Sequence, residues 1–310
     1  MRRNILHLLV IIFLASLLLL FPANCSKGVS LGIHISMYSL IPSILPFMIL
    51  SNYIVYSNMS RYISKIIHPV FSKIFHTSEN GSYVVFMGFL CGFPLGSKIL
   101  FDLLKKRKIS ASEANSLFKY INNPSPSFII CYMSSFYFEN FQSKLILLLM
   151  MYAPSLIIGI FNFHSADNSF QSSAVSQVFS FTKVLDESIF QALQTLVKLS
   201  GYIIVFCIFS TLFSTLANVP SVFKILVACC LEMTSGIFKL AHANLSFLTR
   251  LYLSCVFSIL GGVCVIFQIN SVIRNSELNI FTFIKYKILA VEIFYIIFIL
   301  YYSGALLRML

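Results

Sequence analysis

The sequence predicts an all-α polytopic membrane protein with about seven transmembrane helices, two re-entrant helical hairpins and inverted repeats. Hydrophobic residues make up 58% of the 310-residue chain and charged residues only 10%, whereas a soluble domain carries roughly 25% charged residues. Long apolar runs recur along the chain, and two of them are interrupted by turn-forming or polar residues. The interruptions recur at matching places in the two halves of the chain, as they do in secondary transporters.

Seven runs are long enough, or nearly so, to cross ~30 Å of hydrocarbon as helices. They lie near residues 5–21, 31–57, 115–137, 142–161, 189–216, 246–271 and 281–307. The first run follows Arg2 and Arg3 and is similar to a secretory signal. Because no clean small-residue cleavage site follows it, we expect an uncleaved span.

Two further apolar runs, 81–101 and 222–242, are better explained as re-entrant hairpins. The first is interrupted by Gly92-Phe93-Pro94-Leu95-Gly96, and the second by the segment from Glu232 to Gly236. Irregular backbone at membrane depth is tolerated only where protein or a water-filled cavity surrounds it. Two half-helices that meet at a turn would satisfy this condition.

The basic residues orient these segments, since Lys and Arg gather in cytoplasmic loops. Loop 58–80, with Arg61, Lys65 and Lys73, fits the cytoplasmic side, as do Arg274, Lys285 and Lys287. If 81–101 crossed the membrane, the basic cluster 105–108 would lie outside, so a hairpin is favoured. The net charge of +12 is then explained by basic residues that orient the helices and contact anionic lipid head groups. We therefore expect no nucleic-acid partner.

The chain divides into two similar halves. Gly96 and Gly236 are 140 residues apart, and the breaks at 122–126 and at Gly261-Gly262 are offset by nearly the same amount. Span 31–57 runs inward and span 189–216 outward, so the repeats are inverted. The predicted organisation is an N-terminal helix and loop (1–30), a first repeat (31–161), a polar linker (162–188), a second repeat (189–275) and a C-terminal helix (276–310).

In the first half, the candidate site residues are Gly96, Lys98, Asn122, Asn123 and Ser125. A half-helix that begins near Gly96 would present free backbone N–H groups beside Lys98, which favours an anion. Alternatively, Lys98 snorkels or pairs with Asp102. The two asparagines precede Pro124 and Pro126, which free upstream carbonyls. Alternatively, these amides join neighbouring helices.

In the second half, the candidates are Glu232, Thr234 and Ser235. Glu232 is suited to accept donor groups, bind a proton or help hold a cation, or else it caps its half-helix or pairs with Lys239. Lys198 and Glu292 lie inside spans and either line the pathway or snorkel.

Sequence motifs of hydrolases, transferases and ATP-driven pumps are missing. The eight cysteines and six histidines show no ligand spacing. We therefore expect no enzyme activity, no cofactor and no metal site.

The stretch "GFLCGFPLGSKILFDLLKKRKISASEANSLFKYINNPSP" resembles the sporulation integral membrane protein family of YlbJ type, within the nucleoside-recognition or Gate-domain superfamily. The second half matches through "LEMTSG" and through Gly261-Gly262 with Gln268, which joins the candidate substrate-binding residues. The resemblance covers roughly residues 30–275. The chain departs from the family pattern at Asn-Asn-Pro-Ser-Pro and at Cys264, and both changes bear on the substrate.

The resemblance implies a transporter that moves dipicolinic acid out of the mother cell at the outer forespore membrane of an endospore-forming bacterium. Dipicolinate is a planar dianion, and a lysine, half-helix N-termini and asparagine amides suit two carboxylates. Two alternatives stay open: a nucleoside or nucleobase transporter, and a non-transporting assembly protein of the sporulating membrane. The expected partners are the lipid bilayer and the small anion, and the oligomeric state, a homo-oligomer included, stays open.

Overall fold

The computed structural model describes residues 8, 12, 15–57, 59–162 and 180–307, and all regular elements in these ranges are helices. Three of the described stretches are long and apolar enough to cross a membrane: Phe141–Phe161, Phe181–Ser214 and Phe247–Ile273. The all-α architecture is therefore confirmed, and these helices agree with a membrane protein. The count of seven spans stays a prediction. The first part of the predicted span 5–21 lies outside the described residues.

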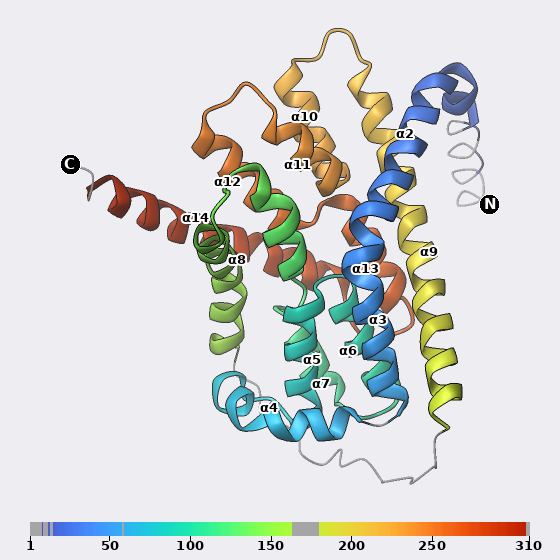
Figure 1. Cartoon of the computed structure of the whole chain (residues 1–310), viewed down its shortest axis with the longest axis vertical. Coiled ribbons are helices and arrows are strands. Elements are labelled where there is room, and N and C mark those ends of the chain that lie inside the picture. The colour runs from blue at the N-terminus through green and yellow to red at the C-terminus, as the bar shows by residue number, and fades with distance from the viewer. Residues whose placement is uncertain (1–7, 9–11, 13–14, 58, 163–179, 308–310) are drawn as a thin grey trace.

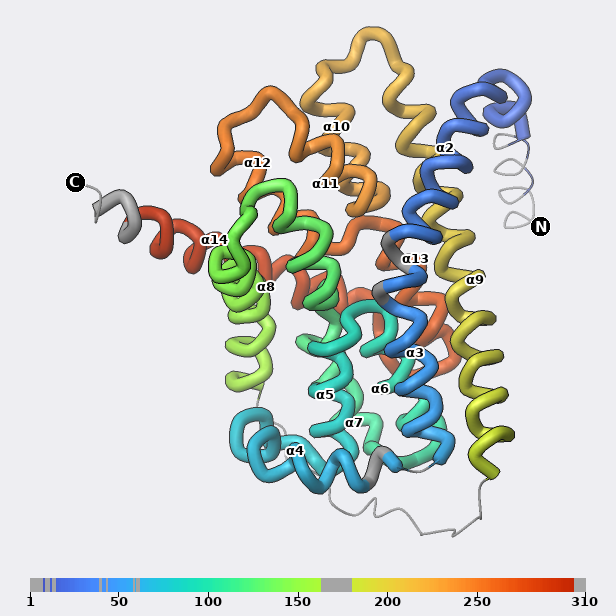
Figure 2. The backbone as a smooth tube through the Cα atoms, viewed as in Figure 1, coloured from blue at the N-terminus to red at the C-terminus, as the bar shows by residue number. Residues whose placement is uncertain are grey.

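Residues 22–30 are helical where a loop was expected. Helix α2 (Pro22–Ile35) continues through a π-helical turn, η1 (Ser36–Leu40), into α3 (Ile41–Tyr56). Helix α2 packs along the upper half of α9 (Phe181–Ser214) in Figures 1 and 2. Cβ atoms at Gly28 and Gly32 would lie 2.6 Å from the Cα atoms of Ile208 and Ile204. This glycine pair lets the two backbones approach closely, as small residues do between membrane helices.

The predicted linker and the predicted cytoplasmic loop also contain helix. Helix α9 begins at Phe181, inside the linker expected at 162–188, and residues 163–179 are outside the described part. Helix α4 (Ser60–Phe75) occupies most of loop 58–80 and runs across the lower end of the bundle in Figure 1. Its Tyr62, Ile66 and Val70 are exposed at a four-residue spacing. An amphipathic helix with this pattern is typical of the membrane interface.

Both segments predicted to form hairpins consist of two short helices joined by a break, while their re-entrant placement in the membrane stays a prediction. The first consists of α5 (Glu79–Cys91) and α6 (Leu95–Lys105), and the second of α10 (Ser221–Leu231) and α11 (Met233–Ala241). In each hairpin the two half-helices pack against each other. Figure 1 shows the first hairpin in the lower half of the molecule and the second at the upper end, so the hairpins come from opposite ends.

Two further segments are broken where the sequence predicted interruptions. The first consists of α7 (Ala111–Phe118), irregular backbone, a π-helical segment η2 (Phe128–Met133) and a short 3-10 turn η3 (Ser134–Phe136). The second consists of α12 (Phe247–Leu260) and α13 (Gly262–Ile273), which meet at two residues with positive φ, Gly261 (78°) and Gly262 (72°). Helices α8 (Phe141–Phe161) and α14 (Ile280–Leu307) pack against each other beside them.

Candidate functional site

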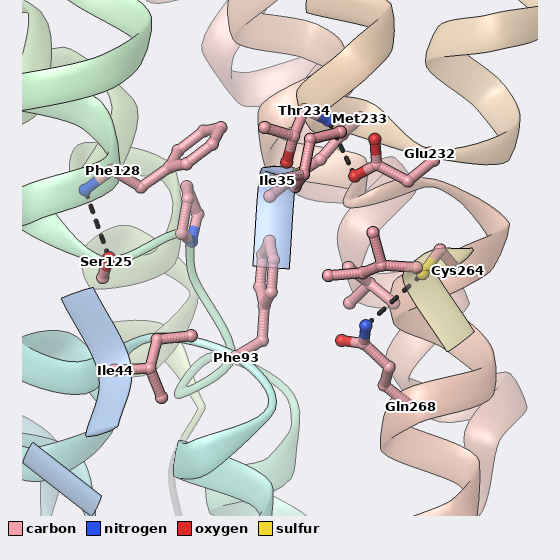
Figure 3. Close-up of a pocket in the computed structure, with 13 residues that line it drawn as sticks. Ile35, Ile44, Phe93, Ser125, Phe128, Glu232, Met233, Thr234, Cys264 and Gln268 are labelled. Carbon is pink, nitrogen blue, oxygen red and sulfur yellow. Dashed lines mark hydrogen bonds between the residues drawn. The ribbon is translucent and has the colours of Figure 1, made fainter. Parts of the chain in front are cut away.

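A cavity of about 50 Å³ lies where the two hairpin turns and the two broken segments converge. Figure 3 shows Ser125 and Phe128 on one side, Glu232, Cys264 and Gln268 on the other, and Phe93 between them. The other lining residues are Ile35, Ile44, Pro124, Ile203, Met233, Thr234 and Val265. Segments that are more than 100 residues apart in the sequence therefore build one site.

Glu232 alone forms the turn of the second hairpin. It is an extended residue (φ −142°, ψ 113°) between α10 and α11. Its Oε1 accepts a hydrogen bond from the Thr234 backbone N–H (2.9 Å), and its Oε2 accepts one from Ser235 (2.7 Å). The negative carboxylate thus satisfies two free donors at the positive end of α11. The capping role that was one of the two interpretations of Glu232 is confirmed, and the residue also lines the cavity.

Two tyrosine hydroxyls bind backbone carbonyls around the cavity. The Tyr152 hydroxyl oxygen lies 2.8 Å from the Phe89 carbonyl oxygen and 2.9 Å from the Pro124 carbonyl oxygen, so its single proton is shared between the two acceptors. Tyr132 donates to the Thr234 carbonyl at 2.8 Å and so joins η2 to the second hairpin. Because a buried carbonyl without a partner is unfavourable, the Tyr152 hydroxyl helps to stabilise the irregular backbone at Pro124, whereas the Tyr132 hydroxyl binds a carbonyl within α11. Sequence reasoning missed both tyrosines, which carry no local signal for this role.

Asn122 and Asn123 lie behind the cavity and hold segments together. The Asn122 side chain accepts from Ser97 Oγ at 2.6 Å and donates to the Phe118 carbonyl at 3.3 Å. The Asn123 side chain donates to the Tyr120 carbonyl at 2.9 Å. Both asparagines are buried, and neither lines the cavity. This geometry matches the alternative in which the amides join helices.

Lys287 was expected in the cytoplasm, but it is buried in the protein. Its Nζ donates to Asn123 Oδ1 at 3.2 Å and lies 5.9 Å from the centroid of the Phe283 ring. Ser155 Oγ donates to the same Asn123 oxygen at 2.5 Å. The signal was present, because Lys287 lies inside the apolar run 281–307, and a lysine within such a run is expensive in a membrane.

Lys98 lies outside the central cavity. Its Nζ is 3.0 Å from Asp102 Oδ2 and 3.3 Å from Asn52 Oδ1, so the pairing alternative is confirmed. It lines a second cavity of about 650 Å³ together with Lys198. Gly96 is a packing residue, because a Cβ there would lie 3.1 Å from Gly88 Cα.

The predicted site residues thus fall into two groups. Ser125, Glu232, Thr234 and Gln268 line the central cavity, where Gln268 also donates to Cys264 Sγ at 3.3 Å. Gly96, Lys98, Asn122, Asn123 and Ser235 are absent from its lining. Glu292 is exposed on α14 and lines neither cavity.

The central cavity combines hydrogen-bonding groups with aromatic rings but is closed to a ring-sized ligand. A hydroxyl, a carboxylate and an amide (Ser125, Glu232, Gln268) lie beside Phe93 and Phe128. A cavity that holds benzene measures about 150 Å³, so 50 Å³ accommodates only a few water molecules. A ligand with an aromatic ring is therefore too large for the cavity in this arrangement of its lining residues. Among the described residues, no His, Cys, Asp and Glu cluster is arranged for a metal ion.

Comparison with known proteins gives one informative relative. No family model and no solved structure matches the chain. The chain is similar to the sporulation integral membrane protein YlbJ of Bacillus subtilis (strain 168), with 25% identity over 235 residues. The match covers 68% of this chain and 58% of the relative, which is less than two thirds of the relative's length. Together with the apolar helices, this similarity agrees with an integral membrane protein.

Proposed function

We propose that the protein is a secondary membrane transporter of a small planar organic anion, with dipicolinate as the substrate. The observation that carries the proposal is the convergence of two hairpin turns and two broken segments, from opposite ends of the molecule, on one small cavity. In secondary transporters the substrate site lies between inverted repeats that contain discontinuous helices. The opposite placement of the hairpins supports inverted repeats here as well.

The choice of an anion follows from the charge along the route to the site. Lys98 and Lys198 line the larger cavity next to the first hairpin. Helix α6 begins at Leu95 without a side-chain cap, so its N-terminal N–H groups carry a partial positive charge that attracts an anion. The rings of Phe93 and Phe128 in the central cavity suit a flat ligand.

Dipicolinate and the outer forespore membrane come from the family resemblance. The curated relative is named for sporulation and for the membrane. A transporter that removes dipicolinate from the mother cell would fit both parts of this name, although the match spans less than two thirds of the relative's length. Pro124 and Cys264 are positions where this chain departs from the family pattern, and both line the central cavity. They are therefore the residues through which a related but different substrate would be selected.

A nucleoside or nucleobase is the second candidate, and one observation favours it. The lining of the central cavity includes no lysine or arginine, while Glu232, Ser125 and Gln268 offer hydrogen bonds. Such a site suits the edge of a neutral base. A non-transporting assembly protein remains the third hypothesis.

A flux assay in proteoliposomes separates the three candidates. Vesicles that contain the purified full chain are loaded with labelled dipicolinate or labelled uridine, with and without ion gradients, and protein-free vesicles serve as the control. We expect protein-dependent dipicolinate flux that unlabelled uridine does not inhibit. Uridine flux without dipicolinate competition would establish the second candidate, and no flux of either compound would favour an assembly role.

A further inference from the structure

The larger cavity, of about 650 Å³, is an open cleft between the polar faces of two helices, and its lining includes the exposed residues Lys105, Lys106, Gln194 and Lys198. Helix α6 contributes Lys98, Asp102 and Lys105, which follow each other at spacings of four and three residues. Helix α9 contributes Gln191, Gln194, Thr195 and Lys198, which also share one helix face. Polar stripes that face each other inside a membrane protein enclose water, because lipid would leave their hydrogen-bonding groups unsatisfied.

The lining of this cavity carries an excess of positive charge. Four lysines (Lys98, Lys105, Lys106 and Lys198) face it together with a single acid, Asp102, which pairs with Lys98. Lys106 Nζ lies 4.7 Å from the centroid of the Tyr56 ring. Burial and the neighbouring Lys108 lower the pKa of Lys106, while Asp102 acts in the opposite direction. The positive charges are therefore only partly compensated within the described part of the chain.

An apolar constriction separates this cavity from the central one. Ile44, Met48, Leu95 and Leu199 surround a narrow gap with no room for a water molecule. Ile44 also lines the central cavity, while Lys98 and Thr195 line both the gap and the larger cavity. The gap therefore shares lining residues with both cavities.

We propose that the larger cavity is a binding site for a small organic dianion, held by Lys105, Lys106 and Lys198 on the near side of the apolar constriction. The proposal rests on the proposed function, because it names the place where the transported anion first binds. Two carboxylates on one planar ring match two or three ammonium groups that line the same space. The constriction keeps the bound anion out of the central cavity until the hairpins move.

Equilibrium binding of labelled dipicolinate to the full chain in nanodiscs of neutral lipid tests the site. We expect Lys198→Gln and Lys106→Gln each to weaken binding about tenfold, as the loss of a charged hydrogen-bonding partner does. Lys198→Arg should retain most of the affinity, because it retains the charge. Lys73→Gln, an exposed lysine on α4, is the matched control and should leave binding unchanged. Equal affinities for Lys198→Gln and Lys73→Gln would overturn the proposal.

Thiol labelling gives a second readout that does not depend on affinity. In a background in which the exposed Cys131 and Cys230 are replaced by serine, Gln194→Cys places a thiol in the cavity. We expect an anionic sulfonate reagent to react there about tenfold faster, relative to a cationic analogue, than at the control Asn244→Cys, since a positive cleft concentrates anions. Dipicolinate should protect Gln194→Cys only, and an equal reagent ratio at both positions would contradict the proposal.

The two proposals fail separately. If dipicolinate binds and protects the thiol but no flux is measured, the binding site stands and the transport function is wrong. If flux is normal while Lys105, Lys106 and Lys198 variants bind and transport as the unmodified chain does, the function stands and this cavity is only a passage.

Discussion

The two hairpins share one layout but close their turns by different means. In the first, Gly92 adopts a φ of 73° and Pro94 follows it. The N–H of Phe93 donates to the Asn123 carbonyl at 2.7 Å, so a second segment completes this turn. In the second hairpin, Glu232 alone forms the turn and caps α11 with its own carboxylate. The same architecture therefore arises from backbone freedom in one case and from a local charge in the other.

Both hairpins nevertheless pack around a similarly placed glycine. A Cβ at Gly96 would lie 3.1 Å from Gly88 Cα, and a Cβ at Gly236 would lie 2.3 Å from Cys229 Cα. Each glycine is in the first turns of the second half-helix, where it lets the two halves of the hairpin approach. Gly96 is the second residue of α6 and Gly236 is the fourth residue of α11, so the two glycines occupy similar but not identical places in their hairpins.

Because their turns differ, the two hairpins also differ in the charge at the N-terminal end of their second half-helix. The Glu232 carboxylate neutralises the positive end of α11, whereas no side chain caps α6. We therefore expect the first hairpin to attract the anion and the second to select it by hydrogen bonds. Four substitutions sharpen or break this comparison, and the largest expected effect on stability comes first.

Gly92→Ala should destabilise the protein most, by about 3 kcal/mol. Gly92 has φ 73° and ψ −172°, a backbone region that is essentially limited to glycine and that costs other residues roughly 1–3 kcal/mol. The new Cβ would also lie 2.5 Å from the Ser125 backbone nitrogen, which adds a packing penalty. Thermal unfolding in detergent, followed by size-exclusion chromatography, measures the loss. Gly201→Ala is the control, because nothing lies within 4 Å of a Cβ there. Equal unfolding midpoints for the two variants would show that the first turn is not built on Gly92.

Glu232→Gln should destabilise the protein by about 2 kcal/mol, since the two backbone donors lose a charged acceptor and one oxygen is replaced by an amide donor. Titration of unfolding with sodium dodecyl sulfate measures the change. Glu292→Gln, on the exposed face of α14, should have no measurable effect. If both variants unfold alike, the second hairpin does not depend on its capping carboxylate.

Lys287→Met should change stability by less than about 1 kcal/mol in the same assay. The substitution removes the bond to Asn123 Oδ1 but also removes the cost of burying a cation. Ser155 continues to donate to that oxygen. Lys285→Met, at an exposed position, is the control. A loss as large as that of Glu232→Gln would mean that Lys287 is a main support of the first broken segment.

Lys98→Gln should have the smallest effect on stability, about 0.5 kcal/mol, because a partly exposed i, i+4 ion pair contributes little. Its effect on dipicolinate flux should be at least tenfold, since it removes a cation between the larger cavity and the constriction. Flux in proteoliposomes that contain equal amounts of protein measures this effect, with Lys73→Gln as the control. Unchanged flux would remove Lys98 from the mechanism.

The sequence by itself determined the membrane class and the places where the helices break. The membrane class follows from hydrophobicity, which is a property of a run of consecutive residues. The breaks follow from the local effects of Gly92, Pro94, Gly261 and Gly262 on backbone geometry. Both features can therefore be predicted without knowledge of the tertiary structure. The first hairpin, the second hairpin and the break after Leu260 follow from such local signals.

The tertiary structure decided which polar groups face the cavity. Asn123 is bound by Lys287, a residue 164 positions away in the sequence, and Lys98 turns toward Asp102 and Asn52 rather than into the central site. Helix α2 exists where a loop was expected because α9 offers it a close-packed surface. Each of these outcomes depends on partners brought together by packing, and no local property of the chain encodes which partner arrives.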